Sequence, residues 1–329
     1  MFCRKLLLIV CCICVFMFSP IIEGQRVHIS IVYACDDNYV VPTIVSMESA
    51  MRSKKGTSFY EFTILVPGEF KSKSKDRFDI FKNKYNEKCT VDIVNMKAAY
   101  SDSCGLLWGK VMYYRLDIPW ILQDKAKAIY IDGDTLVRGD LQELWIIDLG
   151  DNLCGGVIDS DFNKWNDLKK FNPNCDKYIN SGVLLINCKA CREVPFIKEK
   201  IKEYCQNIKN YDFKYPDQDI INVICGGRIR KLPFKFMRLN VLEYSECNYD
   251  ESEYASNFYT KREFLEWRDN PVIVHYAGYG KPWLTNKGIP KKLYNEWHNL
   301  FDTINVEYKF NELKVKSRCC CNCCCCSVG

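Results

Sequence analysis

The feature that most constrains the fold is an alternation of short apolar runs with longer, partly polar stretches near the beginning of the chain. Arg26–Cys35 is rich in β-branched and aromatic residues, which is typical of a buried strand. Tyr39–Arg52 follows with the composition of a helix, and its proline lies in the first turn, where a missing N–H is tolerated. Phe59–Pro67 and Thr90–Asn95 are predicted strands, with a polar helix between them. This alternation predicts an α/β fold with a largely parallel sheet covered by helices.

The rest of the chain continues the pattern without an internal repeat. We predict a helix over Trp108–Leu122 and strands over Ala126–Asp132, Leu153–Ile158, Gly182–Asn187 and Pro271–Ala277. The chain has 329 residues, of which 48% are apolar, enough for the core of one large domain. We therefore expect one folded domain over residues 25–310, preceded by a separate segment at 1–24 and followed by a cysteine-rich tail at 311–329.

The charge of the chain gives little support to a nucleic-acid partner. The formal net charge is only +5, and the lysines and arginines are scattered along the sequence. Nucleic-acid-binding proteins usually concentrate basic residues in one stripe or patch. We expect no nucleic acid among the partners.

The first residues have the pattern of a targeting segment. Arg4 and Lys5 precede the apolar run Leu6–Ile22, which is followed by Glu23–Gln25. A basic start, an apolar stretch and a small residue near a cleavage site are typical of a secretory signal peptide. The run is also just long enough for an uncleaved signal-anchor, and a segment that is never translocated is the third alternative. We expect a location in the secretory pathway, with membrane association through this segment if it is not removed.

The 21 cysteines fall into three groups. Four belong to the first segment, and ten lie from Cys35 to Cys247, an even number that an oxidising compartment could pair. Seven more fill the tail between Arg318 and Ser327, where they could bind metal, carry acyl chains or form disulfides. Cys188 and Cys191 have the spacing of a redox motif, but no second pair completes a zinc site nearby, which favours two thiols or a local disulfide.

Two acidic residues at the end of a predicted strand form the strongest local signal. Asp132 and Asp134 flank Gly133 after the apolar run that ends at Ile131. Side chains two apart on a strand leave the same face, and two carboxylates there repel unless a cation neutralises them. Oxygen ligands suit a hard ion such as Mn²⁺ or Mg²⁺, and glycine lets a bulky ligand approach the backbone. The alternative for an isolated Asp-Gly-Asp is a solvated turn.

A second signal follows the last predicted strand, in the segment His275–Trp283. Imidazole can complete a Mn²⁺ site that is built on carboxylates. Gly278 and Gly280 allow backbone N–H groups to face an anion, and Lys281 supplies a positive charge for phosphate. Taken alone, a histidine after a strand is more often structural.

Six short motifs occur in one order along the chain. They are Ala34–Tyr39 (ACDDNY), Tyr114–Leu116 (YRL), Asp132–Asp134 (DGD), Asn180–Gly182 (NSG), Asp217–Asp219 (DQD) and His275–Trp283 (HYAGYGKPW). In this order and spacing they resemble glycosyltransferase family 8, over roughly residues 27–300. The resemblance implies a GT-A type, Rossmann-like catalytic domain with a mostly parallel sheet. The first segment and the cysteine-rich tail are not part of the family's core pattern.

The resemblance also implies a role for each matching residue. The expected metal ligands are Asp132, Asp134 and His275. The expected donor contacts are Asp36 and Asn38 to uridine, Arg115 to the diphosphate or sugar, Gly278 and Lys281 to the phosphates, and Asp159, Asn180 and Asp217 to the sugar hydroxyls. Gln218 is expected near the anomeric carbon, opposite the leaving group, so that Gln218 and Asp217 are the candidate catalytic residues. An Asx turn is the structural alternative for Asp36, and a surface helix charge is the alternative for Arg115.

The activity implied is a retaining transfer of glucose or galactose from a UDP-sugar, dependent on Mn²⁺ or Mg²⁺. The acceptor is expected to be a glycan, a lipid-linked sugar or a protein. The alternative is a catalytically idle protein of the same fold, which binds a nucleotide-sugar or acts as a secreted interaction module. The complete acidic pair, with His275, Lys281 and Gln218, favours the enzyme.

Overall fold

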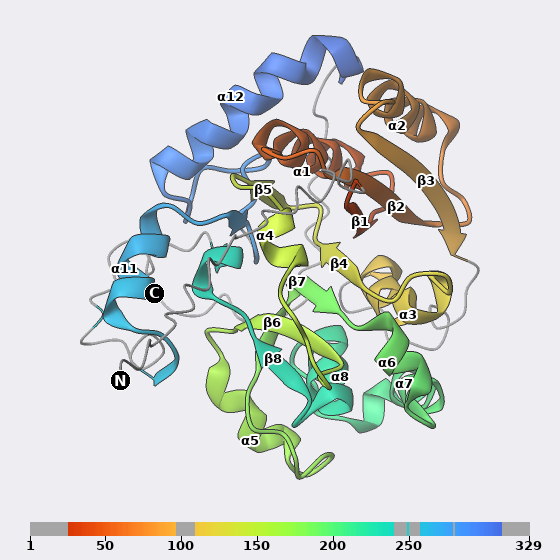
Figure 1. The fold of residues 1–329 in the computed structure, drawn as a ribbon, viewed down its shortest axis with the longest axis vertical. Helices are drawn as coiled ribbons and strands as arrows, with labels where there is room; N and C mark the ends of the chain where they lie inside the picture. Colours follow the sequence, from red (N-terminus) through yellow and green to blue (C-terminus); the bar gives the residue numbers. More distant parts are fainter. Residues whose placement is uncertain (1–25, 97–108, 240–248, 250–256, 279, 311–329) are drawn as a thin grey trace, which may run out of the picture.

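The computed structural model describes residues 26–96, 109–239, 249, 257–278 and 280–310 (Figure 1). Within these residues the strands form a seven-stranded sheet in the order β3-β2-β1-β4-β7-β6-β8 and a three-stranded sheet in the order β5-β10-β9. The strands are β1 (His28–Ala34), β2 (Phe59–Pro67), β3 (Cys89–Met96), β4 (Ala128–Ile131), β5 (Thr135–Val137), β6 (Cys154–Ile158), β7 (Ile179–Ile186), β8 (Ile229–Lys231), β9 (Arg238–Leu239) and β10 (Ile273–His275).

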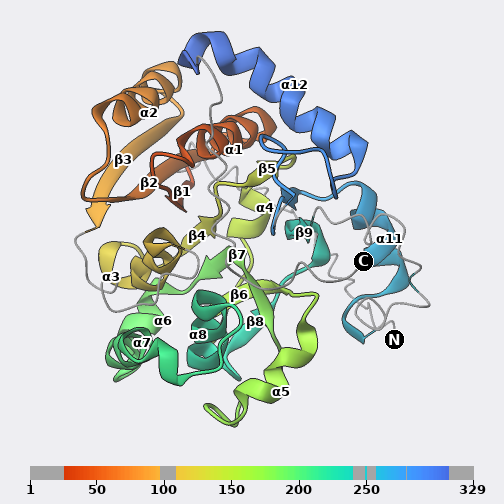
Figure 2. The same cartoon turned by 180° about the vertical axis from the view of Figure 1, so that it is seen from behind.

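The helices around the large sheet include two groups that lie far from each other. Figures 1 and 2 show α1, α2 and α12 grouped at one end, and α6, α7 and α8 at the other. The helices are α1 (Val40–Ser53), α2 (Ser72–Lys84), α3 (Ile118–Ile121), α4 (Gln142–Trp145), α5 (Trp165–Leu168), α6 (Cys188–Glu193), α7 (Ile197–Gln206), α8 (Pro216–Cys225), α11 (Lys261–Asp269) and α12 (Lys291–Tyr308), with 3₁₀ turns η1 (Lys110–Asp117), η2 (Phe162–Lys164), η3 (Ile208–Asn210) and η4 (Phe234–Phe236).

The predicted α/β start of the chain is confirmed. β1 pairs in parallel with β2, from His28 opposite Phe59 to Ala34 opposite Leu65, and β2 pairs in parallel with β3. Every residue of β1 after His28 is buried, as expected for a strand covered on both faces. Parallel pairing of β1 with β4 then brings the ends of these two strands to the same edge of the sheet.

One strand runs against the others and matters for the site. β7 pairs antiparallel with β4 and with β6, whereas β6 and β8 are parallel. The start of β7 therefore lies beside the end of β4, and the backbone N–H of Asp132 donates to the carbonyl of Gly182 at 2.8 Å. The observed sheet is mostly parallel, as the sequence predicts. The reversed strand β7 places Asn180–Gly182 next to the acidic pair.

The predicted helix over Trp108–Leu122 takes a different form. Within the described part, Lys110–Asp117 forms the 3₁₀ helix η1, and a single α-helical turn, α3, follows. Pro119 lies in the first turn of α3, where its missing N–H costs nothing, whereas inside one continuous helix it would remove a hydrogen bond. The proline is thus compatible with a new helical turn that begins at Ile118, but not with one continuous α-helix.

Several expectations fall on residues that the structure does not describe. The first segment (1–24), the tail (311–329), Cys104 and Cys247 lie outside the described residues, so the predicted domain limits stay predictions. Among the residues that are described, no helix combines the length and the apolar character needed to cross a membrane. Cys188 and Cys191 are buried free thiols, so the local disulfide considered for that pair is not formed.

Candidate active site

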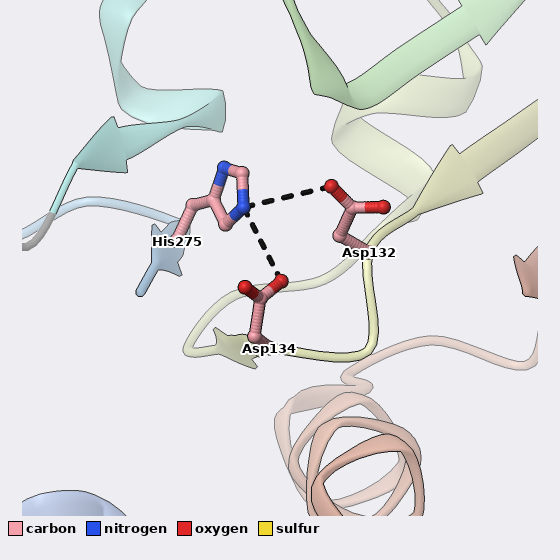
Figure 3. Close-up of side chains that lie close together, drawn as sticks. All are labelled: Asp132, Asp134 and His275. Atoms are coloured by element: carbon pink, nitrogen blue, oxygen red, sulfur yellow. Dashed lines mark ion pairs between the residues drawn. The ribbon is translucent and has the colours of Figure 1, made fainter. Parts of the chain in front are cut away.

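The centre of the site is a cluster of two carboxylates and one imidazole (Figure 3). Asp132 and Asp134 occupy the tight turn between β4 and β5, and His275 ends β10, where it pairs with Thr135 of β5. The His275 Nε2 atom lies 3.6 Å from an oxygen of Asp132 and 3.3 Å from an oxygen of Asp134. One ligand atom from each residue lies within 4.8 Å of the others. Two carboxylates and an imidazole that converge in this way fit a divalent cation such as Mn²⁺.

Two glycines allow close packing around this cluster. A Cβ atom on Gly133 would lie 2.4 Å from Thr43 Oγ1, so this glycine allows the turn to pack on α1. The ligand approach expected at Gly133 stays a prediction. A Cβ atom on Gly182 would lie 2.2 Å from His275 Cε1 and 2.9 Å from a carboxylate oxygen of Asp132. The third residue of the Asn-Ser-Gly motif therefore leaves space for two predicted metal ligands.

Asp134 is buried and strongly paired. Burial disfavours the ionised form, but the Lys281 ammonium and His275 hold the pKa of Asp134 well below its usual value. Lys281 forms an ion pair with Asp134, and its Nζ also donates to the carbonyl of Tyr276 at 2.6 Å. The second ring nitrogen of His275, Nδ1, is buried and has no hydrogen-bond partner among the described residues. The Nε2 face of His275 is therefore the one that is directed at the carboxylates.

Arg115, from η1, is buried beside the cluster rather than exposed on a helix surface. Its guanidinium lies 2.8 Å from an oxygen of Asp132 and 3.3 Å from an oxygen of Asp217. The Nη1 group donates to the carbonyl and hydroxyl of Ser181 at 2.9 and 3.0 Å, and the ring of Tyr130 lies 4.6 Å beneath the guanidinium. Arg115 therefore holds carboxylates in place, and its expected contact with the donor stays a prediction.

Two of the expected sugar-binding residues, Asp159 and Asn180, meet the candidate catalytic residue Gln218 in a second group. Asp159 follows β6, Asn180 lies in β7, and Gln218 lies in the first turn of α8. One oxygen of Asp159 accepts from the amide of Asn180 at 2.8 Å and from the amide of Gln218 at 3.2 Å. All three side chains are buried. Their remaining polar atoms are thus oriented by one another before any ligand binds.

Ser181 joins the two groups, and the sequence motifs assigned it no role. Its backbone N–H donates to Gln218 Oε1 at 2.9 Å, and its hydroxyl donates to Asp217 at 3.2 Å while accepting from Arg115. Burial raises the pKa of Asp217 above its usual value, although Arg115 opposes this effect. The only signal for Ser181 was its position inside the Asn-Ser-Gly motif.

Asp36 and Asn38 lie in the turn that connects β1 with α1. Asp36 accepts from the backbone N–H groups of Asn38 and Tyr39 at 2.9 and 3.1 Å, which is the Asx turn considered as an alternative. Burial, together with Asp134 and other nearby carboxylates, raises the pKa of Tyr39 well above its usual value, so this turn adjoins the cluster. The expected contact with uridine stays a prediction.

Gly278 and Lys281 belong to the segment after β10. Gly278 has φ = 72°, a left-handed conformation that suits glycine, and none of the described atoms would lie within 4 Å of a Cβ there. Gly278 is exposed and Lys281 is directed at Asp134. The structure thus places Lys281 at the cluster, whereas the phosphate contacts expected of both residues stay predictions.

Comparison with known sequences gives consistent relatives. The sequence model of the family described as "Glycosyl transferase family 8" matches residues 30–287. General stress protein A of Bacillus subtilis is 28% identical over 287 residues, which cover 82% of this chain and 95% of that protein. A lipopolysaccharide 1,2-glucosyltransferase of Escherichia coli is 24% identical over 276 residues, covering 80% of this chain and 76% of that protein.

Comparison with solved structures confirms the fold class. The galactosyltransferase LgtC, whose crystal structure was solved in complex with donor and acceptor sugar analogues, superposes with a TM-score of 0.66 at 23% identity. The match covers 84% of this chain and 96% of LgtC. The α/β architecture expected from the sequence, a mostly parallel central sheet of the GT-A type, is therefore the fold of this chain.

Proposed function

Since the chain belongs to glycosyl transferase family 8, and so is a glycosyltransferase, we propose that it transfers glucose or galactose from a UDP-sugar, with Mn²⁺ as its preferred cation and with retention of anomeric configuration. The hexose is supported by relatives that are named a glucosyltransferase and a galactosyltransferase. Retention rests on the family resemblance. The proposed acceptor is a glycan, a lipid-linked sugar or a protein.

The observation that carries this proposal is the connection between the two groups of the site. Asp132, which is 3.6 Å from His275, also pairs with Arg115. Arg115 in turn contacts Asp217, next to Gln218 of the sugar-binding group. Cleavage of a sugar–diphosphate bond requires a cation beside the diphosphate and polar groups beside the sugar. The two adjacent groups, joined by Arg115, are suited to these two tasks.

The chemistry follows from the bond that breaks. As the C1–O bond lengthens, negative charge grows on the β-phosphate, and a cation held by Asp132, Asp134 and His275 would supply electrostatic stabilisation of that charge when bound. Lys281 lies close enough to contribute a second positive charge. Buried Asp159 and Asn180 would orient the hexose hydroxyls.

The opposite side of the sugar needs electron density, because C1 becomes electron-deficient. The carbonyl oxygen of Gln218 is held by the backbone N–H of Ser181, and Asp217 is oriented by Arg115 and the Ser181 hydroxyl. These contacts hold the two candidate catalytic groups in one orientation each, so little reorganisation is needed during the reaction.

A donor screen tests the proposal. We expect release of UDP from UDP-glucose or UDP-galactose with Mn²⁺, increased by a sugar acceptor and abolished by a chelator. Binding of UDP-sugars without any turnover, across both donors and a broad panel of glycan, lipid-linked and glycoprotein acceptors, would instead favour an idle nucleotide-sugar-binding protein.

A further inference from the structure

Lys281, a candidate phosphate ligand, also contacts a candidate ligand of the cation. Its ammonium forms an ion pair with Asp134, and the other oxygen of this carboxylate lies 3.3 Å from His275. Lys281 is held there by a second hydrogen bond, to the carbonyl of Tyr276 at 2.6 Å. Both oxygens of a candidate metal ligand are therefore already engaged by side chains of the chain itself.

A positive charge at this place opposes a second one. The side chains of Lys281 and Asp134 are 12% and 9% exposed, so water screens their charges only weakly. A divalent cation bound by Asp134 would either share the carboxylate with the ammonium, with strong repulsion, or displace it. Displacement of the Lys281 ammonium from Asp134 costs free energy unless the ammonium pairs with another anion.

We propose that Lys281 is a built-in counter-ion of Asp134 that competes with the divalent cation, so that the cation binds tightly only when a diphosphate takes over the lysine. This inference rests on the proposed function, because the diphosphate is that of the UDP-sugar. UDP then raises the affinity for the cation beyond the effect of its own phosphate ligands, and by reciprocity the cation raises the affinity for UDP.

The same arrangement keeps the cluster neutralised before the donor arrives. Asp132 is paired with Arg115 on the other side of the cluster, at 2.8 Å. Arg115 also contacts Asp217 and Ser181, whereas within the described part of the chain the Lys281 ammonium is bonded to Asp134 and to the Tyr276 carbonyl. Of these two cations, Lys281 has fewer partners in the site, which makes it the one that can be transferred to a ligand.

The test is the affinity of the full chain for Mn²⁺ in the absence of nucleotide, measured by calorimetry or by electron paramagnetic resonance of free Mn²⁺. We expect Lys281→Met to bind Mn²⁺ about tenfold more tightly than the wild type, in the usual range of coupling between sites. Lys281→Arg should keep the wild-type affinity because it keeps the charge. Lys287→Met, at an exposed lysine of the same segment, is the matched control and should change nothing.

Repetition with UDP completes the test. UDP should increase Mn²⁺ affinity less in Lys281→Met than in the wild type, and Mn²⁺ should raise the melting temperature of Lys281→Met more than that of the wild type. Equal or weaker Mn²⁺ binding by Lys281→Met, with Lys281→Gln as a second neutral variant, would overturn the inference. If Asp132→Asn binds Mn²⁺ as well as the wild type, the metal site itself is wrong, which is a failure of the proposed function.

Discussion

At the residue scale, the two carboxylates of the β4–β5 turn should each be necessary for transfer. We expect Asp132→Asn and Asp134→Asn to lower turnover by more than about a hundredfold, because a lost cation ligand removes several kcal/mol of leaving-group stabilisation. Mn²⁺-dependent UDP binding should be lost as well. Circular dichroism should show an intact fold. Near-wild-type turnover of either variant with added Mn²⁺ would refute the assignment.

Substitutions of His275 and Lys281 should lower activity in different ways. His275→Ala removes a candidate ligand of the cation, so raised Mn²⁺ should restore part of its activity. Lys281→Ala removes a charge that serves the diphosphate, so its slow chemical step should persist at any Mn²⁺ concentration. Turnover measured across a Mn²⁺ series distinguishes the two variants. Equal rescue of both, or rescue of neither, would contradict the separate roles.

Ser181 should act by orienting its neighbours. Its hydroxyl accepts a hydrogen bond from Arg115 and donates one to the carboxyl group of Asp217. Hydrogen bonds to charged groups contribute about 1.5–3 kcal/mol. Ser181→Ala should therefore lower kcat by roughly 10- to 100-fold, with little change in the KM for the donor. The backbone N–H that holds Gln218 remains in this variant.

A buried serine outside the site provides the control for this prediction. Ser49, on α1, donates to the carbonyl of Ser46 and accepts from the N–H of Val137. Ser49→Ala should lower the melting temperature and leave kcat unchanged. If both serine variants lose only thermal stability, Ser181 has no positioning role.

At the element scale, the reversed strand β7 connects the fold with the site. Its pairing with β4 places Gly182 directly against His275 and Asp132. A parallel strand in the same position would run in the opposite direction and would present its other end at this edge. The direction of one strand therefore decides which residues can meet the acidic pair.

Gly182→Ala tests this packing. A Cβ atom within 2.2 Å of His275 must displace the imidazole or the strand, so we expect a loss of about 1–3 kcal/mol of stability together with weaker Mn²⁺ binding. Chemical unfolding and Mn²⁺ titration measure the two effects. Gly68→Ala is the control, since nothing in the described part of the chain would lie within 4 Å of its Cβ. Unchanged Mn²⁺ binding by a folded Gly182→Ala protein would contradict the proposed contact.

At the scale of the whole molecule, the two ends of the chain carry the last prediction. The basic and apolar segment up to Ile22 predicts entry into the secretory route and a mature N-terminus at or near Gln25. Cys319–Cys326 should then be oxidised rather than acylated, because cytosolic acyl transfer would not reach them. N-terminal sequencing and thiol counting under non-reducing conditions test both points. An intact Met1 with acylated tail cysteines would contradict them.

The sequence by itself determined the local elements and the chemistry available to the site. β2 was predicted with its observed limits, and β1 and α1 within two residues, because side-chain composition and period act over a few neighbours. Asp132, Asp134 and His275 were predicted from the sequence as metal ligands, and in the structure these three side chains lie close together. The very short strands β5, β8 and β9 were missed, since two or three residues have no measurable period.

Only the tertiary structure decided how those residues face one another. The reversal of β7, the ion pair of Lys281 with Asp134 and the bridge made by Ser181 each join segments that are distant along the chain. The physical reason is that strand direction and charge pairing depend on the partner and on burial, which no local pattern encodes. Asp134 and Ser181 are buried, so their contacts exist only once the chain has packed around them.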